Sequence, residues 1–127
     1  MATKVAISAA VPQNIFLMNL YATRTYERVI RKLLSEDARS DMEAAIVAAP
    51  DAAPVIPGTG GIRKLRWRGS GRGKRGGIRA IYFWHAGPEA IYMLTAYAKA
   101  ERDDLTAADR KALSRLVESI EWGGWER

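Results

Sequence analysis

A glycine-rich and strongly basic stretch, residues 58–85, most constrains what this chain can fold into. Its sequence, GTGGIRKLRWRGSGRGKRGGIRAIYFWH, predicts two short strands joined by a glycine-rich turn. Between Ile62 and Arg79 there are eight Lys or Arg residues and no acidic residue, and the remaining 12 basic side chains are outnumbered by 14 acidic ones. The net charge of +6 is therefore local to this hairpin, which indicates a polyanionic partner.

The first strand of the hairpin alternates in character. Lys64, Arg66 and Arg68 share one face of a strand, while Leu65 and Trp67 share the other. Charged hairpins often serve only to keep an exposed sheet edge soluble. Here, however, the cations repel one another and have no acidic partners within the stretch, so we interpret them as a site for an anion.

Composition limits the available chemistry. The 127 residues include no cysteine and a single histidine, His85, which excludes disulfides, thiolate nucleophiles and a two-histidine acid/base pair. We therefore expect no metal and no cofactor. No apolar run approaches membrane-spanning length, so we expect a cytoplasmic protein without a membrane partner. The length suits one domain, residues 1–127, with residues 1–14 as an N-terminal extension.

The rest of the chain predicts helices and strands around the hairpin. Residues 15–21 suit a buried strand, and either Thr23 or Thr25 can cap a first helix. Ser35 can cap a second helix that ends at Pro50.

The second half of the chain predicts a loop, two further strands and a last helix. Residues 50–61 are rich in proline and glycine and predict an ordered crossing loop, whereas residues 78–85 and 90–99 predict strands. Residues 105–120 predict an amphipathic helix that Thr106 caps. The expected order is β-α-α-β-β-β-α, a small α+β domain whose helices lie on one face of an antiparallel sheet.

One nucleotide-binding pattern in the turn is accidental. Residues 71–76 satisfy GxGxxG, but that motif needs a helix after it, and here a strand follows. Nucleic acid is the more natural anion, because lysine and arginine neutralise phosphates and aromatic rings stack on unpaired bases. Trp67 and Trp84 are more typical of core residues than of base platforms.

RNA cleavage without a metal needs a base near the 2′-hydroxyl, a proton source for the leaving oxygen, and cations that stabilise the phosphorane. Without a histidine pair, these roles fall to Lys, Arg and Tyr. The side chains that can converge on one sheet face are Lys64, Lys74, Arg79, Tyr97 and Lys99. His85 is a further candidate contributor, although a lone histidine at a strand end is more often structural.

These residues resemble a known family. The runs PGTGGIRKLRW, GRGKRGGIRAIY and YAK, the last followed by DDLTAADRKAL, are similar to those of the HigB branch of the RelE/ParE toxins. The resemblance covers roughly residues 24–120 and implies the RelE/ParE-like fold. It also implies the toxin of a type II toxin–antitoxin system, a ribosome-dependent mRNA endonuclease that acts on mRNA on the ribosome and inhibits translation. A cognate antitoxin, helix-turn-helix and HigA-like, would hold it inactive.

Site residues follow from the same resemblance. The family's basic and tyrosyl positions match Lys64 and Arg66, then Arg79, then Tyr97 and Lys99. With Lys74 these are the expected catalytic residues, and the expected RNA-binding residues are Arg63, Arg68, Arg72 and Arg75. RelE has an arginine directly after the last lysine, where this chain has Ala100, so the general-acid assignment does not carry over.

Two alternatives stay open on the same fold. One is a ParE-like toxin that poisons DNA gyrase. The other is a non-catalytic module that binds nucleic acid or the antitoxin, for which Ala100 is the best support.

Overall fold

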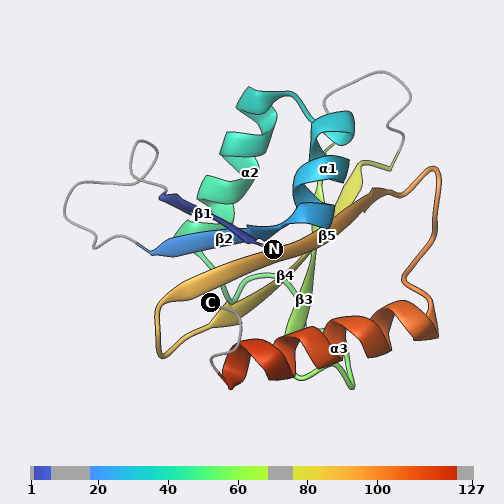
Figure 1. Ribbon diagram of the computed structural model, residues 1–127. Helices are drawn as coiled ribbons and strands as arrows, with labels where there is room; N and C mark the ends of the chain where they lie inside the picture. Colours follow the sequence, from blue (N-terminus) through green and yellow to red (C-terminus); the bar gives the residue numbers. More distant parts are fainter. Residues whose placement is uncertain (1, 7–17, 69–75, 123–127) are drawn as a thin grey trace.

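The computed structural model describes residues 2–6, 18–68 and 76–122 (Figure 1). Their strands form one sheet in the order β1-β2-β5-β4-β3. In chain order the elements are β1 (Ala2–Ala6), β2 (Asn19–Thr23), α1 (Arg24–Leu33), α2 (Glu36–Ala48), β3 (Ile62–Trp67), β4 (Ile78–His85), β5 (Ala90–Ala98) and α3 (Ala107–Glu121).

The α+β class and the predicted order from β2 to α3 are confirmed. One further strand, β1, pairs antiparallel with β2 at the edge of the sheet. The sheet is mixed and not wholly antiparallel, because β2 runs parallel to β5. A parallel neighbour needs a long connection, and the two helices and the basic hairpin lie between these strands in the chain.

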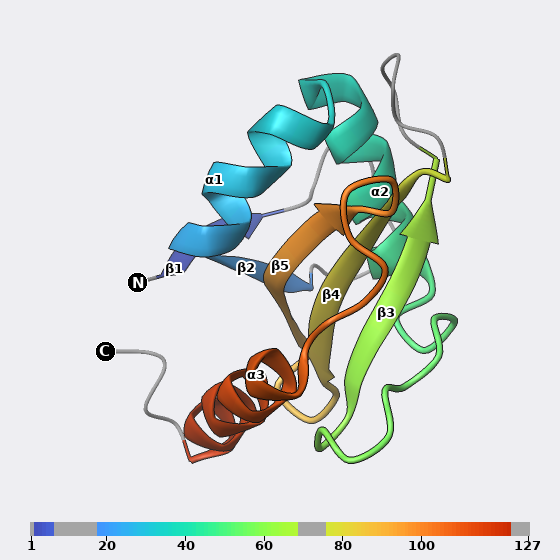
Figure 2. The same ribbon diagram turned by 90° about the vertical axis from the view of Figure 1, so that its right-hand side faces the viewer.

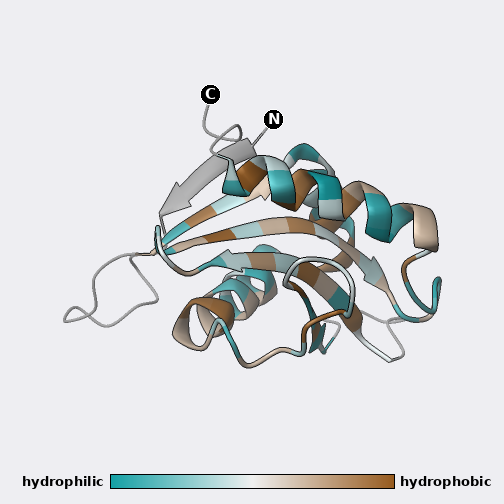
Figure 3. Cartoon of the chain, turned by 90° about the horizontal axis from the view of Figure 1, so that it is seen from below, coloured by the Kyte–Doolittle hydropathy of each residue, from teal (hydrophilic) through white to brown (hydrophobic). Residues whose placement is uncertain are grey.

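The expectation that all helices cover one face is wrong. Helices α1 and α2 pack on the side of Ile78, Ala80 and Tyr82, whereas α3 packs on the side of Ile81 and Phe83 (Figure 2). The cause is visible in β4 itself, where both sets of alternating residues are buried. Figure 3 shows hydrophobic residues in brown along the strands that these helices cover. A strand that is apolar on both faces needs a cover on each of them.

Side-chain caps set the helix ends. The Thr23 hydroxyl accepts a hydrogen bond from the Tyr26 amide at 2.9 Å, which settles the choice between Thr23 and Thr25. Ser35 caps α2 in the same way, and Thr106 and Asp109 form a capping box at the start of α3. These caps satisfy amides that have no partner within their own helix, and the predictions of all three helix starts are confirmed.

A polar network ties α1 to α2 inside the core. The Tyr26 hydroxyl donates to Glu43 at 2.6 Å, and the Arg39 guanidinium donates to the same carboxylate at 2.9 Å. Arg39 also forms two hydrogen bonds to Glu27, each of 3.1 Å. The carboxylate of Glu43 is buried, so these donors replace the water that it loses on folding.

The hairpin enters β4 through Gly77, which has a φ of +71°. A Cβ at this position would overlap the carbonyl oxygen of Trp67, so glycine is required here for both conformation and space.

We expect Gly77→Ala to lower the free energy of unfolding by at least about 2 kcal/mol, from left-handed strain together with the backbone overlap. Chemical denaturation measures this change. Gly87→Ala is the matched control, since a Cβ there meets no atom within 4 Å, and its effect should stay within about 0.5 kcal/mol. Equal stabilities for the two variants would contradict this account of the turn.

Candidate functional site

Three predicted site residues lie in one row across the sheet. Arg66 of β3 is the register partner of Arg79 of β4, and Arg79 is the register partner of Tyr97 of β5. All three are on the side of the sheet that carries α3. Because neighbouring strands lie about 4.8 Å apart, the row brings two guanidinium groups and a phenol within reach of one small ligand.

A β-bulge places Tyr97 in this row. The register of β4 and β5 shifts between Ile81 and Tyr82, so that β5 carries one extra residue, Leu94. Before the shift, Tyr92 faces α3, and after it Tyr97 does so, although strict alternation would place them on opposite faces. The hydroxyl of Thr23 donates to the Leu94 carbonyl at 2.7 Å and so gives the bulged backbone a partner.

Arg79 is buried but has no acidic partner among the described residues. Arg79 is only 6% exposed to solvent. Its Nη1 atom donates to the carbonyls of Gly76 at 2.9 Å and Ile78 at 3.3 Å. These carbonyl oxygens accept hydrogen bonds from Nη1 without cancelling the charge of the guanidinium. A buried cation of this kind favours an anionic ligand.

A shallow groove of about 560 Å³ opens beside this row. Its walls include the cations Arg66, Arg68, Arg79 and Lys99, and Gly76 and Gly77 form part of it without side chains. Arg66 and Arg68 are exposed, and no acid in the described part of the chain pairs with them. The groove can therefore hold a phosphate group close to the backbone.

Tyr97 is buried next to charged neighbours. Its hydroxyl donates to Asp104 at 3.5 Å, and the Arg102 guanidinium lies 5.5 Å from the centre of its ring. Burial raises the pKa of Tyr97, and the charge of Asp104 raises it further, while Arg79 and Arg102 oppose the change. The phenol therefore keeps its proton at neutral pH and is available as a donor.

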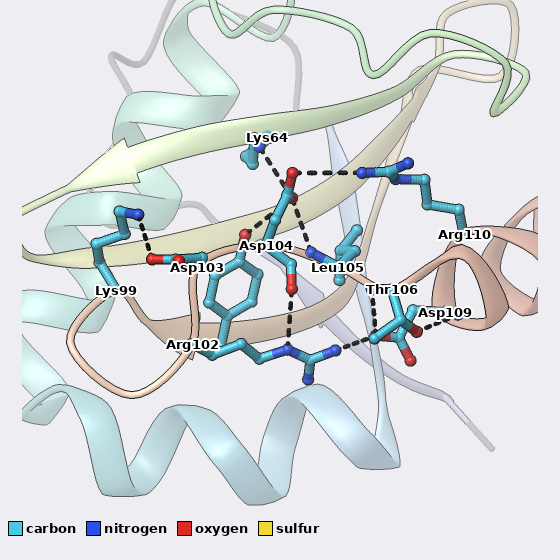
Figure 4. Close-up of polar contacts among 10 residues, drawn as sticks. Lys64, Lys99, Arg102, Asp103, Asp104, Leu105, Thr106, Asp109 and Arg110 are labelled. Carbon is cyan, nitrogen blue, oxygen red and sulfur yellow. Dashed lines mark hydrogen bonds and ion pairs between the residues drawn. The ribbon is translucent and has the colours of Figure 1, made fainter.

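Two acidic residues, Asp103 and Asp104, lie between β5 and α3, and each forms an ion pair with one lysine (Figure 4). Lys64 donates to Asp104 at 3.1 Å, and Lys99 donates to Asp103 at 2.9 Å. Neither pairing was predicted from the sequence. The adjacent pair of aspartates before the helix cap was visible, and Lys99 lies only four residues before Asp103, but the partner of Asp104, Lys64, comes from a distant part of the chain.

The other predicted residues lie elsewhere. Arg63 is on the opposite face of β3, where it donates to the carbonyls of Asp51 at 3.1 Å and Ala53 at 2.7 Å. His85 ends β4, six residues beyond Arg79 and therefore about 20 Å away along the strand. Lys74, Arg72 and Arg75 fall outside the described residues.

A second hollow, of about 410 Å³, lies between the start of α1, β5 and α3. It touches Tyr97 and Arg102, but much of its lining is apolar, including Leu94, Leu105 and Leu113. The cationic groove suits a polyanion better. Within the described residues, no group of three or more His, Cys, Asp or Glu side chains could hold a metal, and no helix is long and apolar enough to cross a membrane.

The fold and the site together define a small α+β domain that presents a cationic sheet face to an anionic ligand. Residues 18–122 match the family described as the RelE toxin of the RelE/RelB toxin–antitoxin system. The chain therefore belongs to the RelE toxin family. It is the toxin of a type II toxin–antitoxin system, and its partner is a cognate antitoxin.

The start of α3 should make the protein acid-sensitive. Hydrogen bonds from the Thr106 backbone and side chain, with the nearby Arg102, hold the pKa of Asp109 below its usual value of 3.8. A carboxylate whose pKa is lower in the folded state contributes stability above the unfolded value, and that contribution disappears as the pH falls through the folded value.

We therefore expect Asp109→Asn to be less stable than the parent chain at pH 6 by about 0.3–1 kcal/mol, the range for a solvent-screened charge at a helix start, with the difference shrinking below pH ~4. Denaturation at a series of pH values measures this difference. Glu118→Gln, at an exposed position near the other end of the same helix, is the control and should not lower the stability at pH 6, because a negative charge there opposes the helix dipole. A pH-independent difference for Asp109→Asn would argue against an electrostatic cause.

Proposed function

We propose that this toxin is a ribosome-dependent mRNA endonuclease of the HigB branch, acting in the cytoplasm on mRNA that is being translated. The observation that carries the proposal is the row of Arg66, Arg79 and Tyr97, with a buried guanidinium that has no described counter-ion. Cleavage in this mechanism uses the 2′-hydroxyl of the RNA itself and requires no metal.

In the reaction, the 2′-oxygen loses its proton to a base and attacks the adjacent phosphorus. The new O–P bond forms as the bond to the 5′-oxygen breaks, which leaves a 2′,3′-cyclic phosphate and a free 5′-hydroxyl. Arg79 and Arg66 stabilise the extra charge of the phosphorane, as positioned cations do in other phosphoryl transfers. Lys64, Lys74 and Lys99 are the candidates for the base, because an uncharged amine within reach of the 2′-hydroxyl can accept its proton.

Tyr97 is the proposed proton donor for the leaving oxygen. It stands next to Arg79, and its raised pKa keeps it protonated. RelE has an arginine where this chain has Ala100. Arg102, two residues further on, donates to the Asp104 carbonyl at 3.1 Å and to the Asp109 carboxylate, so its guanidinium is already engaged.

The family assignment supports a protein antitoxin as the partner, and the HigB resemblance favours a helix-turn-helix, HigA-like one. Arg68, with Arg72 and Arg75 outside the described residues, would contact RNA phosphates. Arg63 donates to the Ala53 carbonyl on the opposite face of β3, so it does not belong to the proposed RNA contacts.

We expect Arg66→Ala to lower the cleavage rate about 10²- to 10³-fold, because it removes one cation from the transition state. The measurement is primer extension on mRNA in a ribosome-programmed cleavage reaction. Arg66 is exposed, so the variant should fold normally. Arg28→Ala, which removes an exposed cation of α1, is the control and should cut at nearly the parent rate.

Tyr97→Phe tests the proton donor. The ring stays and the hydroxyl goes, so we expect kcat to fall about 10²- to 10⁴-fold with little change in KM. An RNA substrate with a better leaving group should restore much of the loss. Equal rates for Phe and Tyr would remove Tyr97 from the mechanism.

Expression without the antitoxin separates the proposal from its alternatives. Growth arrest with cut mRNA is the expected outcome. DNA damage with intact mRNA would identify a gyrase poison, and normal growth would identify a module without toxic activity.

A further inference from the structure

The carboxylate of Asp104 accepts hydrogen bonds from side chains on two strands that are not neighbours in the sheet (Figure 4). Its Oδ1 atom accepts from Lys64 at 3.1 Å and from Tyr97 at 3.5 Å. The Leu105 amide donates to the same oxygen at 2.7 Å, and Arg110 donates to Oδ2 at 3.3 Å. One carboxylate therefore contacts β3, β5 and α3.

The backbone hydrogen bonds of the sheet do not fix the distance between the side chains of Lys64 and Tyr97. They belong to β3 and β5, which both pair with β4 and not with each other. Lysine has a long and flexible side chain, so its strand position alone leaves the ammonium group free to adopt many places. A shared acceptor reduces this freedom and holds the ammonium group near the phenol.

We propose that Asp104 is a positioning residue of the nuclease site, which orients Lys64 and Tyr97 without touching the RNA. This inference rests on the proposed function. The Leu105 amide and the start of α3 fix the carboxylate, and the carboxylate fixes the two side chains. The negative charge of Asp104 weakens RNA binding, because it lies among the cations that bind phosphate. The positioning of Lys64 and Tyr97 instead raises the rate of the chemical step.

The neighbouring Asp103 is a natural comparison. Its side chain is 94% exposed and pairs with Lys99, whose side chain is 37% exposed, whereas Asp104 contacts several groups at once. An exposed single ion pair contributes little to orientation. Both aspartates have the same charge near the groove, so their effects on RNA attraction should be similar.

The test is a comparison of Asp104→Asn and Asp103→Asn in ribosome-programmed mRNA cleavage. Asparagine keeps an oxygen that can accept from the Leu105 amide, and so it preserves the start of α3, which a thermal melt can verify. Loss of one negative charge should lower KM in both variants. Only Asp104→Asn should also lower kcat, by about 10- to 100-fold, while the kcat of Asp103→Asn should change by no more than about twofold.

A kcat for Asp104→Asn equal to or above that of the parent chain would overturn the proposal and make Asp104 merely a charge that weakens RNA binding. A low kcat in both variants would overturn it too, because the effect would then belong to the acidic turn as a whole. A purely structural role would lower the melting temperature in parallel with activity, and this outcome would also count against positioning.

A second measurement does not depend on cleavage. The charged groups around the Tyr97 hydroxyl and Asp104 come from each element packed there: Lys64 of β3, Arg79 of β4, Arg102 before α3 and Arg110 of α3. Because Asp104 raises the pKa of Tyr97, Asp104→Asn should lower it in an NMR titration, and Asp103→Asn should leave it unchanged.

The two failures can be distinguished. If the parent chain does not cut RNA, the proposed function fails, and the titration still decides whether Asp104 controls Tyr97. If the parent chain cuts RNA but the titration and kcat are unchanged in Asp104→Asn, the positioning proposal alone fails.

Discussion

The burial of β4 on both faces is the constraint on which the rest of the structure depends. From Ile78 to Phe83 every residue is buried, so the strand must lie inside the sheet with a cover on each side. The α1–α2 hairpin supplies one cover and α3 the other. The only charged residue in that buried run, Arg79, is therefore held in the interior, where it lines the groove.

Two buried charged residues, Glu43 and Arg79, have different kinds of hydrogen-bond partner. Glu43 has a phenol and a guanidinium as donors, and burial raises the pKa of its partner Tyr26, so that the phenol remains a donor. Arg79 has only carbonyl partners among the described residues. The first arrangement satisfies its charge internally and stabilises the α1–α2 hairpin. The second leaves a charge to be satisfied by a ligand, which is typical of a binding site.

The acids between β5 and α3 explain how a dense group of cations persists in the folded protein. Repulsion between Lys64, Lys99 and the neighbouring arginines would oppose folding if nothing compensated for it. Asp103 and Asp104 supply that compensation from the turn that leads into α3. Because the pair of Lys99 and Asp103 is largely exposed, a phosphate can compete for Lys99 at small cost.

Much of the secondary structure could be predicted because its causes are local. Thr23, Ser35 and Thr106 cap helices through neighbouring amides, and the alternation in β3 separates Arg66 from Trp67 wherever the strand lies. The extra strand β1 and the parallel pairing of β2 with β5 could not be predicted, because nothing near them in the chain specifies which edges will meet. The split of the helices between two faces was likewise missed, although the double burial of β4 was its signal.

The sequence by itself determined the two paired strands of the basic hairpin and the shared face of Lys64 and Arg66, and it favoured an anion as the ligand, because these properties depend on residue type and on the two-residue period of a strand. Only the tertiary structure decided which groups meet there. The bulge at Leu94 turns Tyr97 toward α3, and the turn before α3 brings Asp104 to a lysine 40 positions earlier in the chain. Contacts between distant residues depend on how strands pair and where a helix docks, and no local pattern encodes those choices.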